Sequence, residues 1–522
     1  MANKTLFQSI MGEFVRPTDA QNSEGAPAYK FSPKQMLAQY VATGCMNDTC
    51  YATGQDQLAT VLKLCTEVDP EFIARTALFC RSRGHMKDMP ALLCAILSVR
   101  GPALLVEIFD RVIDSPKMLR NFVQIMRSGA VGRKSLGTLP KRLVETWLES
   151  RSDDSLFCGS VGQDPSLADI IRMVHPRPET ASRKAMFGYL IGRPYIAADL
   201  PPIIQSYEVF KADQTAPMPE VPFQMLTSLK LSDAQWRAIA VSGSWQMTRM
   251  NLNTFARHNV FSCGQTTDAI ARKLRAPELI TKARVLPYQL MAAYMGIGPE
   301  VPAIVRDALQ DAMETAIENV PAIDGHIYVC PDISRSMHSP ITGVRAGGTT
   351  TVRCVDAAAL ITAAIVRKNP RSDVLAFETR VVPVDYNPRD AVLTNAAKFS
   401  SLPAGGTNCS APLAELNRRS ASGDLVIYVS DNESWIDSPH YGRFGGSRTE
   451  TMNQWAIFKG RNPAAKMVCI DLQPNATTQS VERADILNIG GFSDQVFDVI
   501  AAFVAGTLTA DHWVGVIDAV RL

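Results

Sequence analysis

The sequence of 522 residues lacks the features that mark several specialised classes of protein. Its eleven cysteines include no CxxC pair, so we expect buried free thiols rather than zinc ligands or disulfides. It has no apolar run long enough to cross a bilayer and no secretory apolar core near its start, which predicts a cytoplasmic protein without membrane contacts. The net charge is only +2, so an anionic partner would have to meet a local basic patch.

The spacing of apolar residues differs between two parts of the chain. From about Ser32 to Glu318, apolar residues recur at three- and four-residue spacing, as in "DQLATVLKLCTEV" and "PALLVEIFDRVID". This predicts a series of short antiparallel helices of the HEAT type, although no strict period is found. From Asp324, runs such as "HIYVC" alternate with helical segments, which predicts a doubly wound α/β (Rossmann-like) domain. We expect a helical domain over residues 1–321 and an α/β domain over 322–522.

Oxygen-bearing side chains follow the predicted strands of the α/β half. Asp332 comes just after "HIYVC" and is followed at alternate positions by Ser334 and Ser336. Thr407 in "LPAGGTNCS" and Asp431 in "VIYVSDNESW" are expected at later strand ends. Because ligands of doubly wound sheets bind at the carboxyl ends of strands, the five side chains predict one site. Three hydroxyls and two carboxylates suit Mg²⁺ or Mn²⁺ rather than zinc, and such an ion could accept a partner's carboxylate.

Two other interpretations of this stretch are open. Asp332 and the two serines could simply bend and cap a turn, which is the usual role of such residues. A nucleophilic Ser334 is disfavoured, because no G-x-S-x-G elbow surrounds it and the one neighbouring base is His338, which we expect in a surface loop. We therefore expect a protein that is not an enzyme.

Positive charge is concentrated in one part of the helical half. Between Lys117 and Arg193, thirteen Lys and Arg face seven Asp and Glu, an excess of six in a chain whose total is +2. A local excess of this kind is what contacts to phosphate require. Lys141 is discounted because it can pair with Glu145 one helical turn later. The candidate RNA-binding residues are Arg120, Arg127, Arg133, Lys134, His175 and Arg177.

Several stretches resemble the Ro autoantigen family, whose bacterial Ro-related members combine a TROVE module with a von Willebrand factor A domain. They are "QYVATGCMNDTCYATG", "MRSGAVGRK", "KARVLPYQLMAAY", "LPAGGTNCSAPL" and "VSDNESW". The set Asp332, Ser334, Ser336, Thr407 and Asp431 is similar to the metal-ion-dependent adhesion site (MIDAS) of A domains.

The resemblance implies a ring of HEAT-like helices closed by the A domain. It also implies that small noncoding Y RNAs bind outside the ring and that single-stranded 3′ ends of misfolded or damaged RNAs enter its hole. In bacteria the Y RNA can tether such a protein to the exoribonuclease polynucleotide phosphorylase. His175 matches the Y RNA-binding region, and Arg120 and Arg127 match basic positions near the hole. Arg249 and Asn251 match a further motif, which we assign to helix packing.

Two departures from the family pattern bear on these sites. The segment "SRSDDSLFCGSVGQD" is acidic where vertebrate members are basic, and Asn408 stands where they have Asp. We nevertheless expect a monomeric RNA-binding protein that acts in RNA quality control, processing or degradation. The alternative is a protein-interaction scaffold that grips a partner's carboxylate through the metal and does not bind RNA directly. A basic excess on one helical face would favour RNA, and an evenly mixed face would favour protein.

Overall fold

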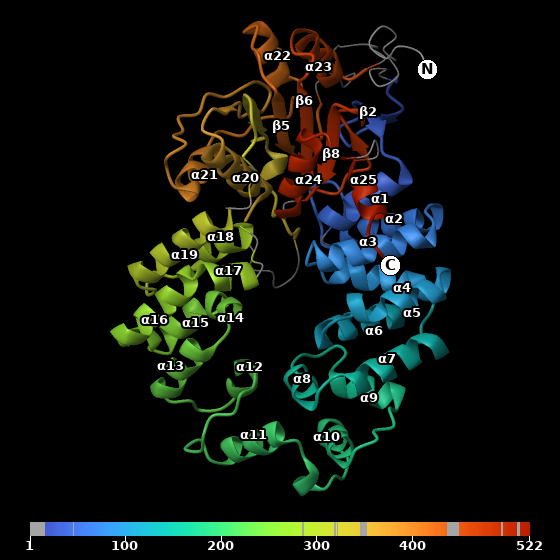
Figure 1. Cartoon of the computed structure of the whole chain (residues 1–522), viewed down its shortest axis with the longest axis vertical. Helices are drawn as coiled ribbons and strands as arrows, with labels where there is room; N and C mark the ends of the chain where they lie inside the picture. The colour runs from blue at the N-terminus through green and yellow to red at the C-terminus, as the bar shows by residue number, and fades with distance from the viewer. Residues whose placement is uncertain are drawn as a thin grey trace. The chain divides into compact units, whose positions relative to one another are not determined.

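The computed structural model describes residues 16–44, 46–283, 285, 287–317, 320, 322–344, 352–435, 448–491, 494–508 and 512–522 (Figure 1). Packing groups them into two compact units. Unit 1 combines the described residues up to Glu67 with those between Ala271 and Ala519, and unit 2 contains Val68–Ile270 and Val520–Leu522. The domain boundary expected between residues 321 and 322 stays a prediction.

Unit 2 consists of short helices, as the apolar spacing predicts. Proline at the first helical position and a capping side chain before it explain where several begin: Asp69 caps α3, and Ser115 accepts a hydrogen bond from the Met118 amide in α6. The helices are α3 (Pro70–Ser82), α4 (Asp88–Arg100), α5 (Pro102–Val112), α6 (Pro116–Ser128), α7 (Thr138–Ser150), α8 (Asp153–Cys158), α9 (Leu167–Val174), α10 (Ala181–Ile191), η2 (Ala197–Asp199), α11 (Pro202–Ala212), α12 (Phe223–Leu226), α13 (Asp233–Ser242), α14 (Trp245–Met250), α15 (Leu252–Arg257) and η3 (Val260–Ser262); α16 (Gly264–Arg275) spans the division between the units.

The first helices of unit 2 stack in the manner of a helical repeat. Helix α3 packs against α4 and α5, α4 against α5 and α6, and α5 against α7. Each helix therefore buries its apolar side between its neighbour and its next neighbour in sequence, as in a solenoid. This confirms the predicted helical-repeat character of this part of the chain.

Unit 1 contains the α/β domain together with helices from both sides of unit 2 in sequence. Its elements are β1 (Ala20–Gln21), β2 (Pro27–Lys30), α1 (Pro33–Thr43), α2 (Gly54–Glu67), α17 (Pro277–Ala283), α18 (Pro287–Gly296), α19 (Ala303–Ala316), β3 (Ile327–Pro331), η4 (Ser336–His338), α20 (Cys354–Lys368), β4 (Asp373–Val374), α21 (Val392–Ser400), α22 (Ala411–Arg418), β5 (Leu425–Ser430), α23 (Glu450–Arg461), β6 (Lys466–Asp471), β7 (Thr477–Thr478), β8 (Ile486–Gly490), α24 (Asp494–Val504) and α25 (His512–Asp518).

Five parallel strands form the main sheet of unit 1, in the order β4-β3-β5-β6-β8. The chain runs outward from β3 to β4 on one side and then crosses to β5 on the other. The point where this direction reverses lies between β3 and β5, which is where doubly wound sheets bind ligands. The predicted doubly wound fold is confirmed.

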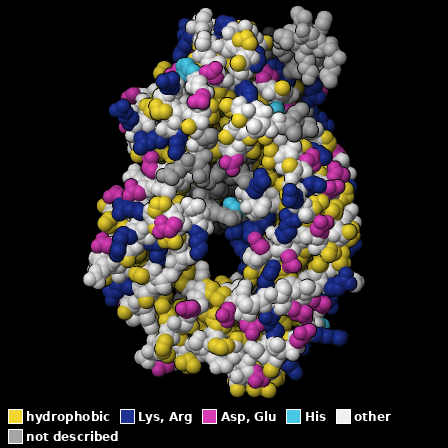
Figure 2. Space-filling view, viewed as in Figure 1, with side chains coloured by type: hydrophobic (Ala, Val, Ile, Leu, Met, Phe, Trp, Pro, Cys, Tyr) yellow, Lys and Arg dark blue, Asp and Glu magenta, His cyan; other side chains and the backbone are white. Residues whose placement is uncertain are grey.

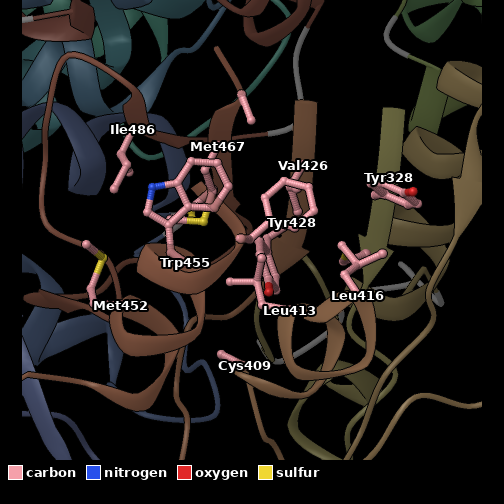
Figure 3. Close-up of a cluster of buried hydrophobic side chains, with 14 of the residues drawn as sticks. Tyr328, Cys409, Leu413, Leu416, Val426, Tyr428, Met452, Trp455, Met467 and Ile486 are labelled. Carbon is pink, nitrogen blue, oxygen red and sulfur yellow. The ribbon is translucent and has the colours of Figure 1, made fainter. Parts of the chain in front are cut away.

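Alternate residues of the strands face a core on one side of the sheet, where α22 and α23 cover it (Figure 3). Tyr328 of β3 and Val426 and Tyr428 of β5 point into this core, and Trp455 of α23 is completely buried beside Met467. Helix α20 packs against β3 and β5, and α24 against β6 and β8. Because both faces are covered, the strands consist of continuous apolar runs rather than alternating ones.

The early part of the chain contributes its own strand pairing to unit 1. Strand β2 pairs antiparallel with β1 and with β7, with Tyr29 opposite Thr478. Tyr29 also joins the buried core described above. Residues more than 400 positions apart are therefore packed together in the same unit.

An ion-pair network stabilises the α23 side of the sheet. Asp485 accepts bonds from Arg483 and, at 3.1 Å, from the Trp455 indole, with Lys459 3.6 Å away. Burial tends to raise the pKa of Asp485, but the hydrogen bonds and charge of Arg483 outweigh burial and hold it below its ordinary value. The carboxylate therefore favours the folded state above its unfolded pKa, and this contribution disappears as pH falls through the folded pKa.

Asp485→Ala is accordingly expected to lower the free energy of unfolding by about 3 kcal/mol at neutral pH, because it removes the carboxylate that pairs with the largely buried Arg483 side chain and with Lys459. Urea denaturation measures this change. The control is Asp390→Ala, whose pair with Lys398 is about one-third exposed, and its expected cost is under about 1 kcal/mol. Equal costs for the two variants would contradict the role given to the network.

The described cysteines behave as the composition predicts. All ten carry free thiols, and seven of them are buried; Cys45 lies outside the described residues. Within the ranges given above, none of the helices combines the length and the apolar character needed to cross a membrane.

Candidate functional site

Asp332 and Asp431 follow the two strands that flank the reversal point of the sheet. Asp332 comes directly after β3 and Asp431 directly after β5, and these strands pair up to Pro331 opposite Val429. Both aspartates are completely buried. The strand-end positions predicted for these two residues are confirmed.

The Asp332 carboxylate is held in place by short hydrogen bonds. Its Oδ1 accepts from the Ser334 amide at 2.8 Å and its Oδ2 from the Ser430 hydroxyl at 2.6 Å. Burial raises the pKa of Asp332, while the bonds from Ser430 and Ser334 lower it in part. Asp332 therefore fixes the loop that carries the two serines.

Asp431 lacks any comparable support. Neither of its carboxylate oxygens, both buried, has a hydrogen bond of ordinary geometry among the residues the structure describes; the Ser336 hydroxyl and the Glu433 amide lie near enough only to lower its pKa in part. Burial raises its pKa well above the ordinary value, and the charge of Asp332 adds to the rise. A buried carboxylate without a partner is unfavourable, so its surroundings suit a cation.

Ser334 and Ser336 bring hydroxyl oxygens to the same place. Their Oγ atoms lie 3.2 Å apart, and Ser336 opens the short helix η4. The Ser336 hydroxyl partly offsets the rise in the pKa of Asp431. It therefore lies near that carboxylate, although it makes no hydrogen bond of ordinary geometry with it.

Thr407 reaches the site from a loop between α21 and α22, so the expectation that it ends a strand is wrong. The loop is positioned by its backbone: the Arg335 amide donates to the Gly405 carbonyl at 3.0 Å, and the Trp435 amide donates to the Thr407 carbonyl at 3.2 Å. A side chain at Gly406 would lie 2.4 Å from the Trp435 indole nitrogen, so only glycine allows this approach. Buried Thr407 is thereby tied to the segments that carry the serines and Asp431.

The donor set fits a hard divalent cation. The described residues contain no cluster of three or more His, Cys, Asp or Glu side chains that could hold a metal ion. The site instead has two carboxylates and three hydroxyls, and one carboxylate has both oxygens without a partner. Oxygen donors of this kind suit Mg²⁺ or Mn²⁺ and do not suit zinc.

Buried polar groups that contact the segment after Asp431 were not predicted from the sequence. Asp471 ends β6 and accepts from the side-chain amides of Gln39 and, at 3.4 Å, Asn432. Asn432 has a left-handed backbone conformation (φ 64°), which asparagine tolerates, so the chain turns directly after Asp431. Asn475 donates to the Asp431 carbonyl. A polar residue at the end of an apolar strand run was the signal for Asp471, but nothing local pointed to Gln39.

The sequence suggested that His338 is a surface loop residue, but the structure places it among other side chains. Its Nδ1 lies 2.8 Å from Arg353 Nη1, and its Nε2 is buried without a hydrogen-bond partner in the described part of the chain. Burial and then the charge of Arg353 lower its pKa. Arg353 in turn pairs with Asp356 at 2.8 Å, so His338 belongs to a structural network.

The candidate RNA-binding residues all lie in unit 2, with different surroundings. Arg127, Arg133, Lys134, His175 and Arg177 are exposed. His175 also ends α9 in a left-handed conformation (φ 55°), so it has a capping role whatever else it does.

Arg120 is half-buried and already makes one structural contact. Its Nη1 donates to the Val161 carbonyl at 2.5 Å, and its buried Nε has no hydrogen-bond partner among the described residues. Burial lowers its pKa. Arg120 therefore supports the turn at Val161 and offers only part of its guanidinium to a ligand.

Helix α6 carries its cations along one side. Lys117, Arg120 and Arg127 recur at spacings of three and seven residues, which place them on one helical face, while Met118, Phe122 and Met126 are buried on another. We call Lys117, Arg120 and Arg127 the α6 basic stripe. Lys87 lies near it: its amine loses solvent and feels the charges of Lys117 and Arg81, which lower its pKa.

Other arginines of the basic segment serve the fold. Arg183 bonds Asp153 at 2.5 Å and the carbonyls of Leu148 and Arg151, and Arg172 pairs with Asp169 at 3.2 Å. Lys141 pairs with Glu145 at 3.8 Å, as the sequence predicts. Over the face in Figure 2, Lys and Arg are interspersed with Asp and Glu. The clearest local excess of positive charge is the α6 basic stripe.

Fold and site together define a class: a stack of repeat helices in one chain with a von Willebrand factor A domain that has a cluster of oxygen-bearing side chains at the sheet's reversal point. The family model described as the Ro60 vWA domain matches residues 326–504. The resemblance to the Ro family is thereby confirmed, and residues 326–504 of this chain are similar to the Ro60 type of A domain.

The likeness extends over nearly the whole chain. "RNA-binding protein RO60" of Deinococcus radiodurans is 24% identical over 531 residues, which cover 93% of this chain and 95% of that protein. The crystal structure of the Deinococcus radiodurans RO (RSR) protein matches with a TM-score of 0.61 and 21% identity, covering 91% of this chain and all of that one. The structural match concerns the fold.

Proposed function

We propose that this chain is a non-enzymatic RNA-binding protein that contacts RNA phosphates through unit 2. The observation that carries the proposal is the α6 basic stripe, which ends just before the exposed Arg133 and Lys134. Lys117 lies in the first turn of α6, where a positive charge opposes the helix dipole. Helix stability therefore does not account for a cation at this position, whereas binding of an anionic ligand would. The relative named an RNA-binding protein supports the same function.

The proposed ligands are small noncoding Y-like RNAs and the single-stranded ends of misfolded or damaged RNAs, in RNA quality control, processing or degradation. Phosphate contacts supply affinity without reading sequence, and unpaired ends add selectivity through shape and stacking. An exoribonuclease such as polynucleotide phosphorylase is the proposed partner. Purified protein should carry nucleic acid that ribonuclease removes. Protein purified with no nucleic acid and no affinity for structured RNA would favour the scaffold alternative.

We further propose that Asp332, Ser334, Ser336, Thr407 and Asp431 hold Mg²⁺ or Mn²⁺. The unpartnered oxygens of Asp431 support this proposal. When bound, the ion would supply positive charge to this buried carboxylate. Ser430 and the Ser334 amide would keep Asp332 oriented.

A double change at the proposed RNA surface tests the first proposal. Arg133→Glu combined with His175→Ala is expected to weaken binding of a small structured RNA by about tenfold at moderate salt, because two contacts are lost. Fluorescence anisotropy measures the affinity. His175→Asn is the matched control for the cap, because asparagine also tolerates the left-handed conformation. Wild-type affinity in the double variant would show that these residues lie outside the interface.

A further inference from the structure

The segment of residues 192–198, here called the Tyr195 segment, is an exposed connection between two helices of unit 2. It follows α10 and runs into η2, just before α11 (Figure 1), and all of its residues are exposed. Two adjacent residues in it have large apolar side chains, Tyr195 at 43% exposure and Ile196 at 66%. Adjacent apolar side chains in water mark a binding surface more often than single ones do.

Contacts at both ends hold the Tyr195 segment in place. The Arg193 amide donates to the Gly188 carbonyl of α10 at 2.9 Å, and a side chain at Gly188 would lie 3.1 Å from the Tyr195 Cβ. After the segment, the Gln205 side chain of α11 donates to the Leu200 carbonyl at 2.6 Å. The segment is therefore ordered before any ligand binds, and Tyr195 loses little further freedom on binding.

The Tyr195 ring is the most exposed member of a row of aromatic rings. It meets the Tyr189 ring edge to face, with centroids 5.7 Å apart, and Tyr189 meets buried Phe157 in the same way at 6.2 Å. Tyr207 of α11 packs edge to face against Phe157 at 5.6 Å. The Tyr189 hydroxyl donates to Glu208 at 2.6 Å, which fixes its ring. The buried rings thus hold the exposed Tyr195 ring in a set orientation.

Positive charge borders the exposed end of this row. Arg193, the second residue of the Tyr195 segment, is exposed. Arg172 of α9 donates from Nη2 to the Ile191 carbonyl at 2.8 Å, so its guanidinium lies at the start of the segment, where it also pairs with Asp169 at 3.2 Å. Residues 184–198 include no Asp or Glu. A surface of this kind attracts a chain of phosphates.

We propose that the Tyr195 segment is a stacking site for an unpaired base of single-stranded RNA, with Arg193 and Arg172 on the neighbouring phosphates. The inference rests on the proposed function in RNA binding and assigns one of its sites. Every base has a flat face that can stack on an aromatic ring, so the site accepts single strands of any sequence. A duplex keeps these faces within its own stack, so the site selects unpaired ends. The two arginines favour a polyanion over an apolar protein surface.

A short oligouridine and the same oligomer with abasic positions are the probes, and fluorescence anisotropy measures their affinity. Tyr195→Ala is expected to bind the oligouridine about tenfold more weakly than the wild type, because one stacking contact is lost, and to bind the abasic oligomer equally well. Tyr195→Phe keeps the ring and should stay within about twofold of the wild type, whereas Tyr195→Leu should be as weak as Tyr195→Ala. Wild-type affinity in Tyr195→Leu would overturn stacking and indicate an apolar surface for a protein partner.

Salt dependence separates the ring from the arginines. Arg193→Ala should make the slope of log affinity against log salt shallower by about 0.7, and Tyr195→Ala should leave the slope unchanged because the ring releases no counterion. Ile196→Ala is the control, and should bind within about twofold of the wild type because isoleucine offers no ring to a base. A wild type that binds structured RNA but not oligouridine would overturn the stacking site alone. A wild type that binds neither would overturn the proposed function itself.

Discussion

Reversing two charges of the α6 basic stripe, Lys117→Glu together with Arg127→Glu, is expected to weaken RNA binding about a hundredfold at moderate salt. Each change removes a cation from the phosphate backbone and puts a repelling carboxylate in its place. Both side chains are exposed, and the apolar face of α6 is untouched. The two changes have opposite effects on the stability of α6, because Glu is favoured in the first turn of a helix and disfavoured in the last.

The salt dependence of binding distinguishes lost phosphate contacts from a general disturbance. The slope of log affinity against log salt should become shallower by about 1.4 to 1.8 when two contacts are lost. Lys230→Glu is the control for each single change, since Lys230 is an exposed lysine of the same unit and its replacement alters the charge as much as either Lys117→Glu or Arg127→Glu alone. A double variant no weaker than Lys230→Glu would exclude α6 from the interface.

The sequence predicted the parts of the site that follow directly from strand ends. Asp332 and Asp431 could be found because a carboxylate follows an apolar run, and parallel strands bring such positions together. Thr407 was predicted to belong to the site, but it was expected at the end of a strand and lies in a loop instead. Its loop is located by backbone bonds to Arg335 and Trp435, and no local pattern reveals such bonds.

The parts of the site that the sequence did not predict depend on contacts between segments that are far apart in the chain. Gln39 of α1 bonds Asp471, and Asp48 pairs with Val344, so helix α1 and a short loop of the first 67 residues reach the A domain. No local pattern in the sequence reveals either partner. Arg120 looked like a surface cation because its helical position was visible, whereas its partner, the Val161 carbonyl, lies 41 residues away. Whether a charged side chain can bind a ligand depends on such partners. Sequence spacing therefore predicts which face of a helix a charge lies on better than it predicts whether that charge is already bonded within the protein.

Asp431→Asn is expected to abolish metal binding and yet stabilise the metal-free protein. Wild-type protein should gain about 2.7 kcal/mol in its free energy of unfolding when Mg²⁺ is present at a hundred times its dissociation constant. The variant should lose this gain, with Mn²⁺ affinity reduced at least about a hundredfold, because a neutral amide replaces one of two carboxylates. Without metal, it should gain about 1 to 3 kcal/mol, because the change removes a buried charge that lacks any hydrogen-bond partner among the described residues.

The same change at the neighbouring carboxylate provides the control. Asp332→Asn should also lose metal binding, but it should destabilise the metal-free protein, because Asp332 accepts bonds from both the Ser334 amide and the Ser430 hydroxyl. An asparagine offers only one acceptor oxygen in place of two. The two variants are therefore expected to agree in their metal affinity and to differ in the sign of their effect on metal-free stability. Thermal unfolding with Mg²⁺ or with a chelator measures both quantities. If both variants unfolded more easily than the wild type without metal, Asp431 would have a partner other than the proposed ion.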